Sequence, residues 1–381
     1  MSDLIKNVYA FTDEQLQLRD TVRRFMAERT STKQTRELME SISGFDESLY
    51  RQLLAELGVG GIHVPEEYGG AGLSYEELAI VLEEMGRVLY PSPFFSSHVL
   101  ATNALLLVGS PEQKAEWLPK IASGEVNATV AFYEDSNLRD LRNFQQTVQN
   151  GRFTGSKERV TDAFGANLII VIAPDAVADR MPCFWLARCG RDADIRYEPT
   201  NSIDETRRIG EVGFYDVPVE RLGDGGHTQQ LYSQFIDFAC VALANEMVGG
   251  AQWLLESAVE YANNRVQFGR PISSMQAIKH KCADLLLEVE FAKSAAYRAA
   301  TAIAEGDSKL PEYASIAKAA SNTAYMQAAN DAIQIHGGIG FTWDNDTHLW
   351  YKRAKSSEVF FGTTEMHRET LMQRIDLAEG A

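Results

Sequence analysis

The chain has 381 residues, of which 45% are hydrophobic and 23% are charged, and its formal net charge at pH 7 is −17. This length exceeds what one simple hydrophobic core organises, so we expect two or three domains. The acidic balance argues against nucleic acids and anionic membrane surfaces as general partners. An anionic ligand would therefore need a local basic site.

The sequence carries no recognisable targeting or membrane-spanning segment. Its first ten residues lack an apolar run of signal-peptide length. No stretch approaches the roughly 18 uninterrupted apolar residues of a membrane span. The cysteines have the spacing of neither a zinc site nor a disulfide framework; they are Cys183, Cys189, Cys240 and Cys282. We expect a cytoplasmic protein with reduced thiols, no metal site and no membrane contact.

Residues 1–125 have the pattern of a helical domain. Ser74 and Glu77 have the spacing of a capping box, which predicts the start of a helix. Apolar residues then recur at steps of three and four, as on one helix face; they are Tyr75, Leu78, Leu82, Met85 and Leu89. Pro91 ends this helix, and Ser110–Pro111 begins another.

Residues 126–226 change to a β pattern. Short runs rich in β-branched and aromatic residues are separated by turn signals such as Asn150-Gly151. These runs are Ala128–Phe132, Leu168–Ala173, Cys183–Ala187 and Ile209–Tyr215. Their length and spacing predict a small antiparallel β-barrel or sandwich.

Residues 227–381 return to the helical period. Three long helices are predicted, from Phe238 to Tyr261, from Met275 to Ala296 and from Ala319 to Ile335. Their small alanine faces allow close approach, as in an up-down bundle. The predicted fold class is therefore α+β: an N-terminal helical domain, a middle antiparallel β-barrel domain and a C-terminal four-helix bundle.

The segment Arg265–Ile272 joins two of these helices. It places two guanidinium groups, an amide and an aromatic ring close together, and Gln276 follows it. Arginine offers planar donors that suit phosphate. Gly269 frees the turn, and Pro271 ends the first helix. The segment predicts a helix-to-helix corner that binds a phosphorylated cofactor; the alternative is an ordinary turn with surface arginines.

Two glycine clusters, Gly69–Gly72 and Gly337–Gly340, also suggest close backbone approach. Neither is a dinucleotide fingerprint, which requires G-x-G-x-x-G directly after a strand, and no P-loop motif occurs. Helix ends and turns would explain both clusters. The functional alternative for Gly337 and Gly338 is contact of their N–H groups with a pyrophosphate.

Three ordered segments resemble the acyl-CoA dehydrogenase family. They are Gly58–Leu73, Arg265–Ile278 and Ala332–Thr342, the last followed by Val359–Glu365. The resemblance implies the same order of helices, β-domain and four-helix bundle. It also implies an FAD-dependent oxidoreductase, usually tetrameric, that desaturates acyl-CoA thioesters and passes electrons to an electron-transfer flavoprotein.

The resemblance further implies a set of FAD-binding residues, shared between neighbouring subunits. The set is Arg265, Gln267, Phe268, Gln276, Gln334, Gly337, Gly338, Thr363 and Glu365. By the same resemblance, Gln334, Gly337 and Gly338 would meet the pyrophosphate of a neighbouring subunit's FAD. Arg265 and Phe268 would approach it from the other side. Thr363 and Glu365 would contact the adenosine half.

The catalytic base of the family is missing from both of its usual positions. Desaturation needs a carboxylate to take the α-proton, and burial suits a glutamate for this task. Most members have that glutamate directly before the C-terminal Gly-Thr, where this chain has Phe361. Others place it on the long helix, near Ala239 here. The nearby acids are Asp237, Glu246, Glu358 and Glu365.

The middle domain also departs from the family pattern. The Thr-Glu-Pro and Gly-Ser-Asp run of the family appears as Phe132–Asp140, without the threonine, proline and glycine. The Trp-Ile-Thr run that packs on the flavin appears as Arg159–Asp162, in which a cation replaces the indole. The pyrophosphate and adenosine contacts are better retained.

Three hypotheses follow. The chain is a subunit of a heterotetrameric acyl-CoA dehydrogenase of fatty-acid or steroid side-chain catabolism, whose homologous partner supplies the base. Alternatively, it is a self-sufficient homotetrameric dehydrogenase with a relocated base. A third hypothesis is a flavin- or CoA-binding relative without dehydrogenase activity. The first fits the retained cofactor signature and the lost base.

Overall fold

The computed structural model describes the chain except residues 1–10, 135–143, 178–180, 191–192, 225–228 and 380–381. The chain forms two compact units. One contains residues 1–36, 75–90 and 240–381, and the other contains residues 37–74 and 91–239. The predicted domain boundaries, 1–125, 126–226 and 227–381, follow sequence order instead and stay a prediction.

The first unit is helical, as its sequence period predicts. Its helices are α1 (Asp13–Arg29), α4 (Tyr75–Arg87), α8 (Gln276–Glu305), α9 (Leu310–His336), α10 (Thr347–Val359) and α11 (Thr364–Glu379), with the later part of α7 (Gln229–Asn264). Helix α9 packs against α8, α10 and α11, while α4 packs against α1 and α8. Alanines fill the α8 and α9 contacts, so these backbones approach closely. The three long helices predicted from sequence are confirmed.

Helix α7 has the length and composition of a membrane span. Its most apolar 18-residue window has a mean hydropathy of 1.2. However, 83% of that window is buried inside the protein, which is the pattern of a core helix. Length and composition are therefore weak grounds for placing α7 in a membrane.

The second unit contains two four-stranded sheets. Their strand orders are β1-β4-β5-β8 and β2-β3-β7-β6. The strands are β1 (Ala128–Ala131), β2 (Val148–Gln149), β3 (Arg152–Thr161), β4 (Leu168–Pro174), β5 (Pro182–Arg188), β6 (Ile195–Pro199), β7 (Ile209–Pro218) and β8 (Glu220–Arg221). Side chains from both sheets, including Phe153, Val171, Trp185 and Phe214, share one core.

The predicted antiparallel barrel is therefore wrong in two respects. The sheets are not closed on each other, and β1 pairs with β4 in parallel, with Ala128 opposite Leu168. Alternation along a strand shows which face is buried, but pairing of the edge strands depends on distant segments. The four strands that the sequence predicted are all present.

The remaining elements of the second unit are short helices. They are α3 (Glu47–Leu57), α5 (Thr102–Val108) and α6 (Pro111–Ala122), with a π-helical stretch at Phe95–Ala101; α2 (Thr32–Glu40) crosses into this unit at residue 37. Ser110 caps α6 through a reciprocal capping box with Gln113. The predicted start of this helix is thereby confirmed.

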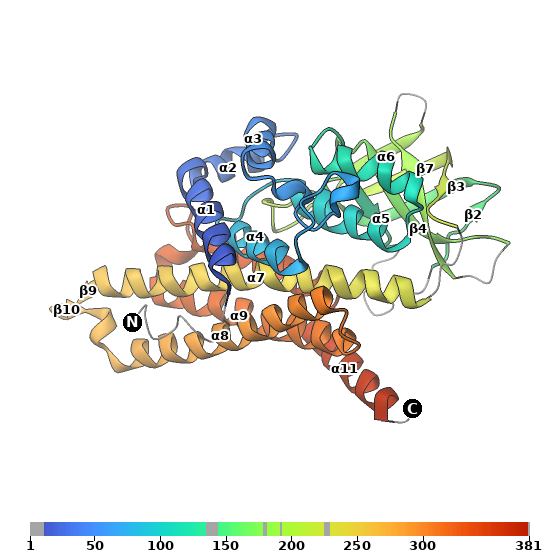
Figure 1. Ribbon diagram of the computed structural model, residues 1–381. Coiled ribbons are helices and arrows are strands. Elements are labelled where there is room, and N and C mark those ends of the chain that lie inside the picture. Colours follow the sequence, from blue (N-terminus) through green and yellow to red (C-terminus); the bar gives the residue numbers. More distant parts are fainter. Residues whose placement is uncertain (1–10, 135–143, 178–180, 191–192, 225–228, 380–381) are drawn as a thin grey trace. The chain divides into compact units, whose positions relative to one another are not determined.

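The segment between α7 and α8 is a β-hairpin and not a direct helix corner. Helix α7 ends at Asn264, and strands β9 (Val266–Gln267) and β10 (Arg270–Pro271) pair before α8 begins. Figure 1 shows this hairpin at the end of the two long helices. The turn residues Phe268 and Gly269 have φ of 53° and 76°, as a two-residue hairpin of type I′ requires. Pro271 therefore does not end the helix, because the chain has already left it.

Candidate functional site

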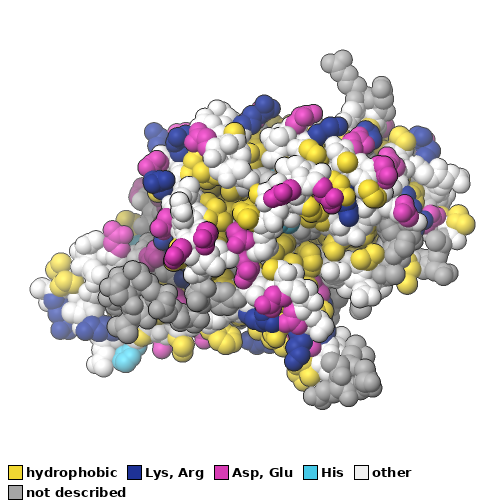
Figure 2. Space-filling model, in the orientation of Figure 1, with side chains coloured by type: hydrophobic (Ala, Val, Ile, Leu, Met, Phe, Trp, Pro, Cys, Tyr) yellow, Lys and Arg dark blue, Asp and Glu magenta, His cyan; other side chains and the backbone are white. Residues whose placement is uncertain are grey.

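The hairpin presents its predicted cofactor residues to solvent. Phe268 is 90% exposed at the tip. Arg265, Gln267 and Gln276 are exposed as well, and their side chains form no hydrogen bond or ion pair with the residues that the structure describes. In Figure 2 basic side chains gather at the end of the molecule where Figure 1 places the hairpin. The hairpin thus offers the local basic site that an anionic ligand of this acidic protein needs.

The glycine cluster after α9 is open, whereas the N-terminal cluster is packed. A Cβ atom at Gly337 or Gly338 would meet no atom within 4 Å, and Gly337 has a φ of 67°. A Cβ at Gly70 would instead lie 2.0 Å from the Val64 carbonyl oxygen, so that cluster is a tight turn. The backbone at Gly337 and Gly338 is accessible to a ligand, and Gln334 is exposed one turn earlier on α9.

The residue at the usual position of the base is a buried aromatic. Phe361 lies in the α10–α11 junction, is 1% exposed and has a φ of 61°, an unusual conformation for a bulky residue. Thr363 follows it and accepts a hydrogen bond at Oγ1 from the Met366 amide at 3.4 Å. Glu365 is exposed in the first turn of α11, where its own backbone N–H and the Thr363 hydroxyl lower its pKa.

The acids near the usual base positions are engaged elsewhere. Glu246 forms a buried ion pair with Arg353, with 2.8 Å between Oε1 and Nη1. Glu358 pairs with Lys355 at 2.6 Å. On α7, Ala239 is 1% exposed and Asp237 is 4% exposed. Glu246 and Glu358 are thus each held in an ion pair.

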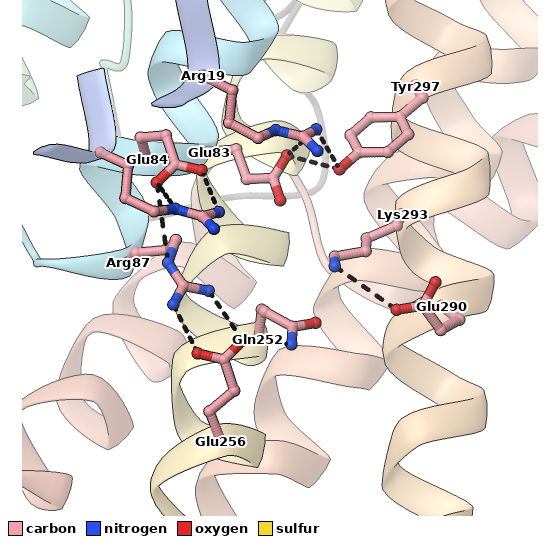
Figure 3. Close-up of polar contacts among 10 residues, drawn as sticks. Arg19, Glu83, Glu84, Arg87, Gln252, Glu256, Glu290, Lys293 and Tyr297 are labelled. Carbon is pink, nitrogen blue, oxygen red and sulfur yellow. Dashed lines mark hydrogen bonds and ion pairs between the residues drawn. The ribbon is translucent and has the colours of Figure 1, made fainter. Parts of the chain in front are cut away.

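A second set of charged side chains, in the first unit, consists of acids that are each paired with an arginine. Glu83 accepts a hydrogen bond from the Tyr297 hydroxyl at 2.6 Å and faces Arg19 (Figure 3). Arg87 bridges Glu84 and Glu256, with 2.5 Å to the latter (Figure 3). Arg23 also pairs with Glu84, so the set contains three acids and three arginines. This network joins α1, α4, α7 and α8 and is structural.

The sequence pattern indicated no role for Thr161, which lies in the Arg159–Asp162 run of the second unit. Thr161 is 1% exposed, and its Oγ1 has no hydrogen-bond partner among the described residues, although its carbonyl accepts from Thr129. A buried hydroxyl without a partner is costly unless a ligand completes it. The flanking Arg159 and Asp162 both have a φ of 52°. Backbone strain on each side of an unpaired hydroxyl is typical of a ligand site.

An aromatic ring of the Phe132–Asp140 run lies against the Arg159 side chain. Phe132 and Tyr133 are buried, with ring centroids 4.2 Å apart, and the Arg159 guanidinium lies 5.5 Å from the Tyr133 centroid. Glu134 pairs with the buried Lys157 at 2.5 Å. Most of the Phe132–Asp140 run, from residue 135 onward, lies outside the described residues.

Comparison with known proteins decides the family. Residues 12–125 match the N-terminal domain of acyl-CoA dehydrogenases, and residues 230–375 match the C-terminal domain. The chain is 33% identical over 345 residues to acyl-CoA dehydrogenase IpdE2 of Mycobacterium tuberculosis, covering 91% of this chain and 92% of that protein. The chain belongs to the acyl-CoA dehydrogenase family. These enzymes are FAD-dependent oxidoreductases that act on CH–CH bonds.

Two further members of the acyl-CoA dehydrogenase family are similar to this chain in sequence or in structure. Human mitochondrial short-chain specific acyl-CoA dehydrogenase is 31% identical, with 82% of this chain and 78% of that protein covered. A solved structure described as a Tcur3481-Tcur3483 steroid ACAD variant superposes with a TM-score of 0.87 at 27% identity, covering 97% of this chain and 99% of that one. This acyl-CoA dehydrogenase therefore has the family fold over nearly its whole length.

The residues of this acyl-CoA dehydrogenase fit FAD in part. The unpaired Thr161 hydroxyl, the open backbone at Gly337 and Gly338 and the unpaired Arg265 guanidinium are each suited to a polar, anionic flavin nucleotide. Phe361 and Ala239 do not supply the base that the reaction needs. No cluster of metal ligands occurs among the residues that the structure describes.

Proposed function

We propose that this acyl-CoA dehydrogenase chain is a subunit of a heteromeric enzyme, in which a homologous chain supplies the catalytic glutamate. The observation that carries the proposal is the buried, strained Phe361 at the position of the base, together with the ion pair between Glu246 and Arg353. Of the four acids near the usual base positions, Glu246 and Glu358 are held by cations, and our proposal assigns Glu365 to the adenosine half of the cofactor. The retained cofactor residues indicate that the chain still forms its share of an FAD site.

The division of labour follows from the chemistry of desaturation. A carboxylate takes the α-proton of the thioester while a hydride leaves the β-carbon, which leaves the α,β double bond. When FAD is bound, it supplies the acceptor for that hydride. In our proposal Arg265, Gln267, Phe268 and Gln276 of the hairpin segment, with Gln334, Gly337 and Gly338, hold the pyrophosphate region, and Thr363 and Glu365 hold the adenosine half. The homologous partner provides the proton acceptor.

The substrate class is inferred from the relatives. The steroid enzyme at 27% identity acts, by its description, on a steroid substrate. A complex described as ChsE4-ChsE5 from Mycobacterium tuberculosis has the same fold, with a TM-score of 0.87 at 23% identity and with 96% of this chain and 98% of that one covered. We infer a bulky acyl-CoA thioester, such as a steroid side chain, in the cytoplasm, with an electron-transfer flavoprotein as the electron acceptor.

Co-expression with a homologous chain that bears the glutamate tests the proposal. The lone chain should retain little flavin, whereas the mixed assembly should hold about one flavin per two subunits, as a site shared across an interface implies. A steroid-type acyl-CoA should bleach the flavin absorbance of the mixed assembly. A homotetramer with a full flavin complement that an acyl-CoA bleaches would contradict the proposal.

Substitution of the acids separates the partner's base from a relocated one. Glutamine in place of the partner's glutamate should abolish bleaching of the mixed assembly. Glu358→Gln in this chain should leave it unchanged, because Glu358 is paired with Lys355. Glu246→Gln should lower stability, since it removes the carboxylate that faces the buried Arg353, but the folded fraction should bleach at the normal rate. Loss of turnover in Glu358→Gln would favour the self-sufficient enzyme.

A further inference from the structure

A buried lysine lies beneath the α10–α11 junction. Lys318 on α9 is 0% exposed, and its Nζ donates to Asn322 Oδ1 at 2.6 Å, to the Ser357 carbonyl at 3.0 Å and to the Gly362 carbonyl at 3.3 Å. An ammonium group has three donors, so these acceptors use all of them. Lys318 forms no ion pair within the described part of the chain. Its three partners are neutral.

The amide of Asn322 extends the same contact. Its Nδ2 donates to the Glu358 carbonyl at 3.3 Å and to the Gly362 carbonyl at 3.4 Å. Two side chains one turn apart on α9 therefore hold the last carbonyls of α10 and the carbonyl that precedes Thr363. These carbonyls would otherwise be unsatisfied at a helix end.

The chain between these held carbonyls has a strained conformation. Phe361 and Gly362 have φ of 61° and 117°. His367 Nε2 lies 3.1 Å from the Phe361 carbonyl and belongs to the first turns of α11. A bulky residue with positive φ persists only when its surroundings impose it. Here the imposed geometry sets where Thr363 and Glu365 begin α11.

Burial of a cation without an anionic partner costs free energy. The presence of Lys318 here therefore indicates that its contacts serve a function that compensates for this cost. Desolvation lowers the pKa of Lys318 to about 7, and the neighbouring Cys240 and Glu358 oppose this shift. His367 and Arg374, both on α11, are further titratable or charged groups near this site. His367 stays neutral because burial and Lys318 hold its pKa at about 3. Arg374 donates a hydrogen bond to the Ser315 hydroxyl near the start of α9.

We propose that Lys318 is a positioning residue for the cofactor loop, which holds the Phe361–Gly362 turn so that Thr363 and Glu365 meet the flavin nucleotide. The inference rests on the proposed role of these two residues in FAD binding. Lys318 does not touch the cofactor, and it acts through the carbonyls that it bonds. Because FAD is anionic, its binding at the start of α11 favours the ammonium form of Lys318.

Hydrogen exchange tests the contact without any cofactor. In Lys318→Met the backbone amides of residues 357–366 should exchange roughly tenfold faster than in the unsubstituted protein, since the junction loses its bonds. Lys293→Met is the matched control, because Lys293 pairs only with Glu290 of its own helix within the described part of the chain. Exchange of residues 357–366 should be unchanged in this variant. If Lys318→Met does not fold, Asn322→Ala removes one acceptor of Lys318 and both bonds that Asn322 donates to the junction, and it should give the same local change. Unchanged protection of these amides from exchange in the folded variants would show that Lys318 and Asn322 do not hold the junction.

FAD affinity as a function of pH tests the positioning role. The deflavinated protein, in the oligomeric form in which it is isolated, is titrated with FAD by flavin fluorescence between pH 6 and pH 8.5. The Kd should rise roughly three- to tenfold over this interval as Lys318 loses its proton. Lys318→Met should bind more weakly with a flat profile, and Lys293→Met should match the unsubstituted protein. All forms carry His280→Gln, so that the exposed histidine on α8 is absent from every protein compared.

The possible outcomes separate this inference from the proposed function. A pH dependence that persists in Lys318→Met would overturn the positioning role. Faster exchange of residues 357–366 with unchanged FAD affinity would show that Lys318 stabilises the junction but does not contribute to FAD binding. Failure of the unsubstituted assembly to bind FAD would contradict the proposed cofactor role of the chain, and the exchange experiment would still decide whether Lys318 holds the junction.

Discussion

Gly86 on α4 and Gly249 on α7 each lie against the backbone of the opposite helix. A Cβ atom at Gly86 would stand 1.9 Å from the carbonyl oxygen of Glu246, and one at Gly249 would stand 1.9 Å from that of Glu83. The two contacts are reciprocal, so the helices cross at their glycines. This crossing places the Glu246 side chain beside Arg353 and Glu83 beside Tyr297.

Gly249→Ala should therefore destabilise the protein. The added methyl group cannot fit without separating the helices, and overpacking of this kind costs about 1–3 kcal/mol or more. Thermal unfolding should show a lower Tm for this variant and for Gly86→Ala. Gly190→Ala is the control, because a Cβ at Gly190 would meet nothing within 4 Å. Equal Tm values for all three variants would contradict the close crossing.

Phe268→Asn should separate stability from cofactor binding. Phe268 has a φ of 53° and is 90% exposed, whereas asparagine before glycine suits this hairpin turn. The substitution should raise the free energy of unfolding by about 0.5–1 kcal/mol because it relieves strain without losing packing. At the same time, FAD retention should fall, measured as flavin per chain after gel filtration. A variant that is more stable and keeps its flavin would exclude Phe268 from the site.

Thr161→Val tests whether the unpaired hydroxyl serves a ligand. Valine has the same shape, and removal of a buried hydroxyl without a partner should leave the Tm of the cofactor-free protein unchanged or raise it. Loss of a hydrogen bond to FAD would weaken binding by about 1–2 kcal/mol, or roughly 5- to 30-fold in Kd. Isothermal titration of the cofactor-free assembly measures this change. A marked drop in Tm without FAD would instead show that the hydroxyl has a partner in the protein.

His98 should make stability fall in acid. It is buried, with Nδ1 2.8 Å from the Gly60 carbonyl and Nε2 2.6 Å from the Tyr50 hydroxyl. Burial lowers its pKa from 6.5 to about 3. The unfolded chain therefore takes up a proton below pH 6.5 that the folded protein refuses. The stability due to neutral His98 is complete above pH 6.5 and is lost as pH falls toward 3, at about 1.4 kcal/mol per pH unit.

Urea unfolding at several pH values measures this dependence. His63, which is half-buried, and His367, which is buried, also have lowered pKa values, so the total slope exceeds that of one group. His98→Gln should reduce the slope between pH 6 and pH 4 by about 1.4 kcal/mol per pH unit, the contribution of one proton. An unchanged slope in this variant would mean that His98 is protonated in the folded protein.

Local patterns were sufficient for most of the elements. Steps of three and four predicted α4, α7, α8 and α9, because a helix that packs on one side repeats its apolar residues at its own period. Ser110 predicted the start of α6 through its capping geometry. The β-rich runs predicted four strands but missed the two-residue strands β2 and β8, and also β3 and β6, which contain many polar residues. The hairpin after α7 was also missed, since Phe268 is an unusual residue for its turn.

The sequence by itself determined the helices, the main strands, the family and the loss of the base at Phe361. These properties depend on residue identity and on spacing along the chain. Only the tertiary structure showed that the sheets stay open, that Arg353 holds Glu246, that Thr161 Oγ1 has no partner among the described residues and that Lys318 binds carbonyls at the α10–α11 junction. Each of these depends on contacts between residues far apart in sequence. Burial and pairing in such contacts, and not residue type alone, decide which polar groups are free to bind a ligand.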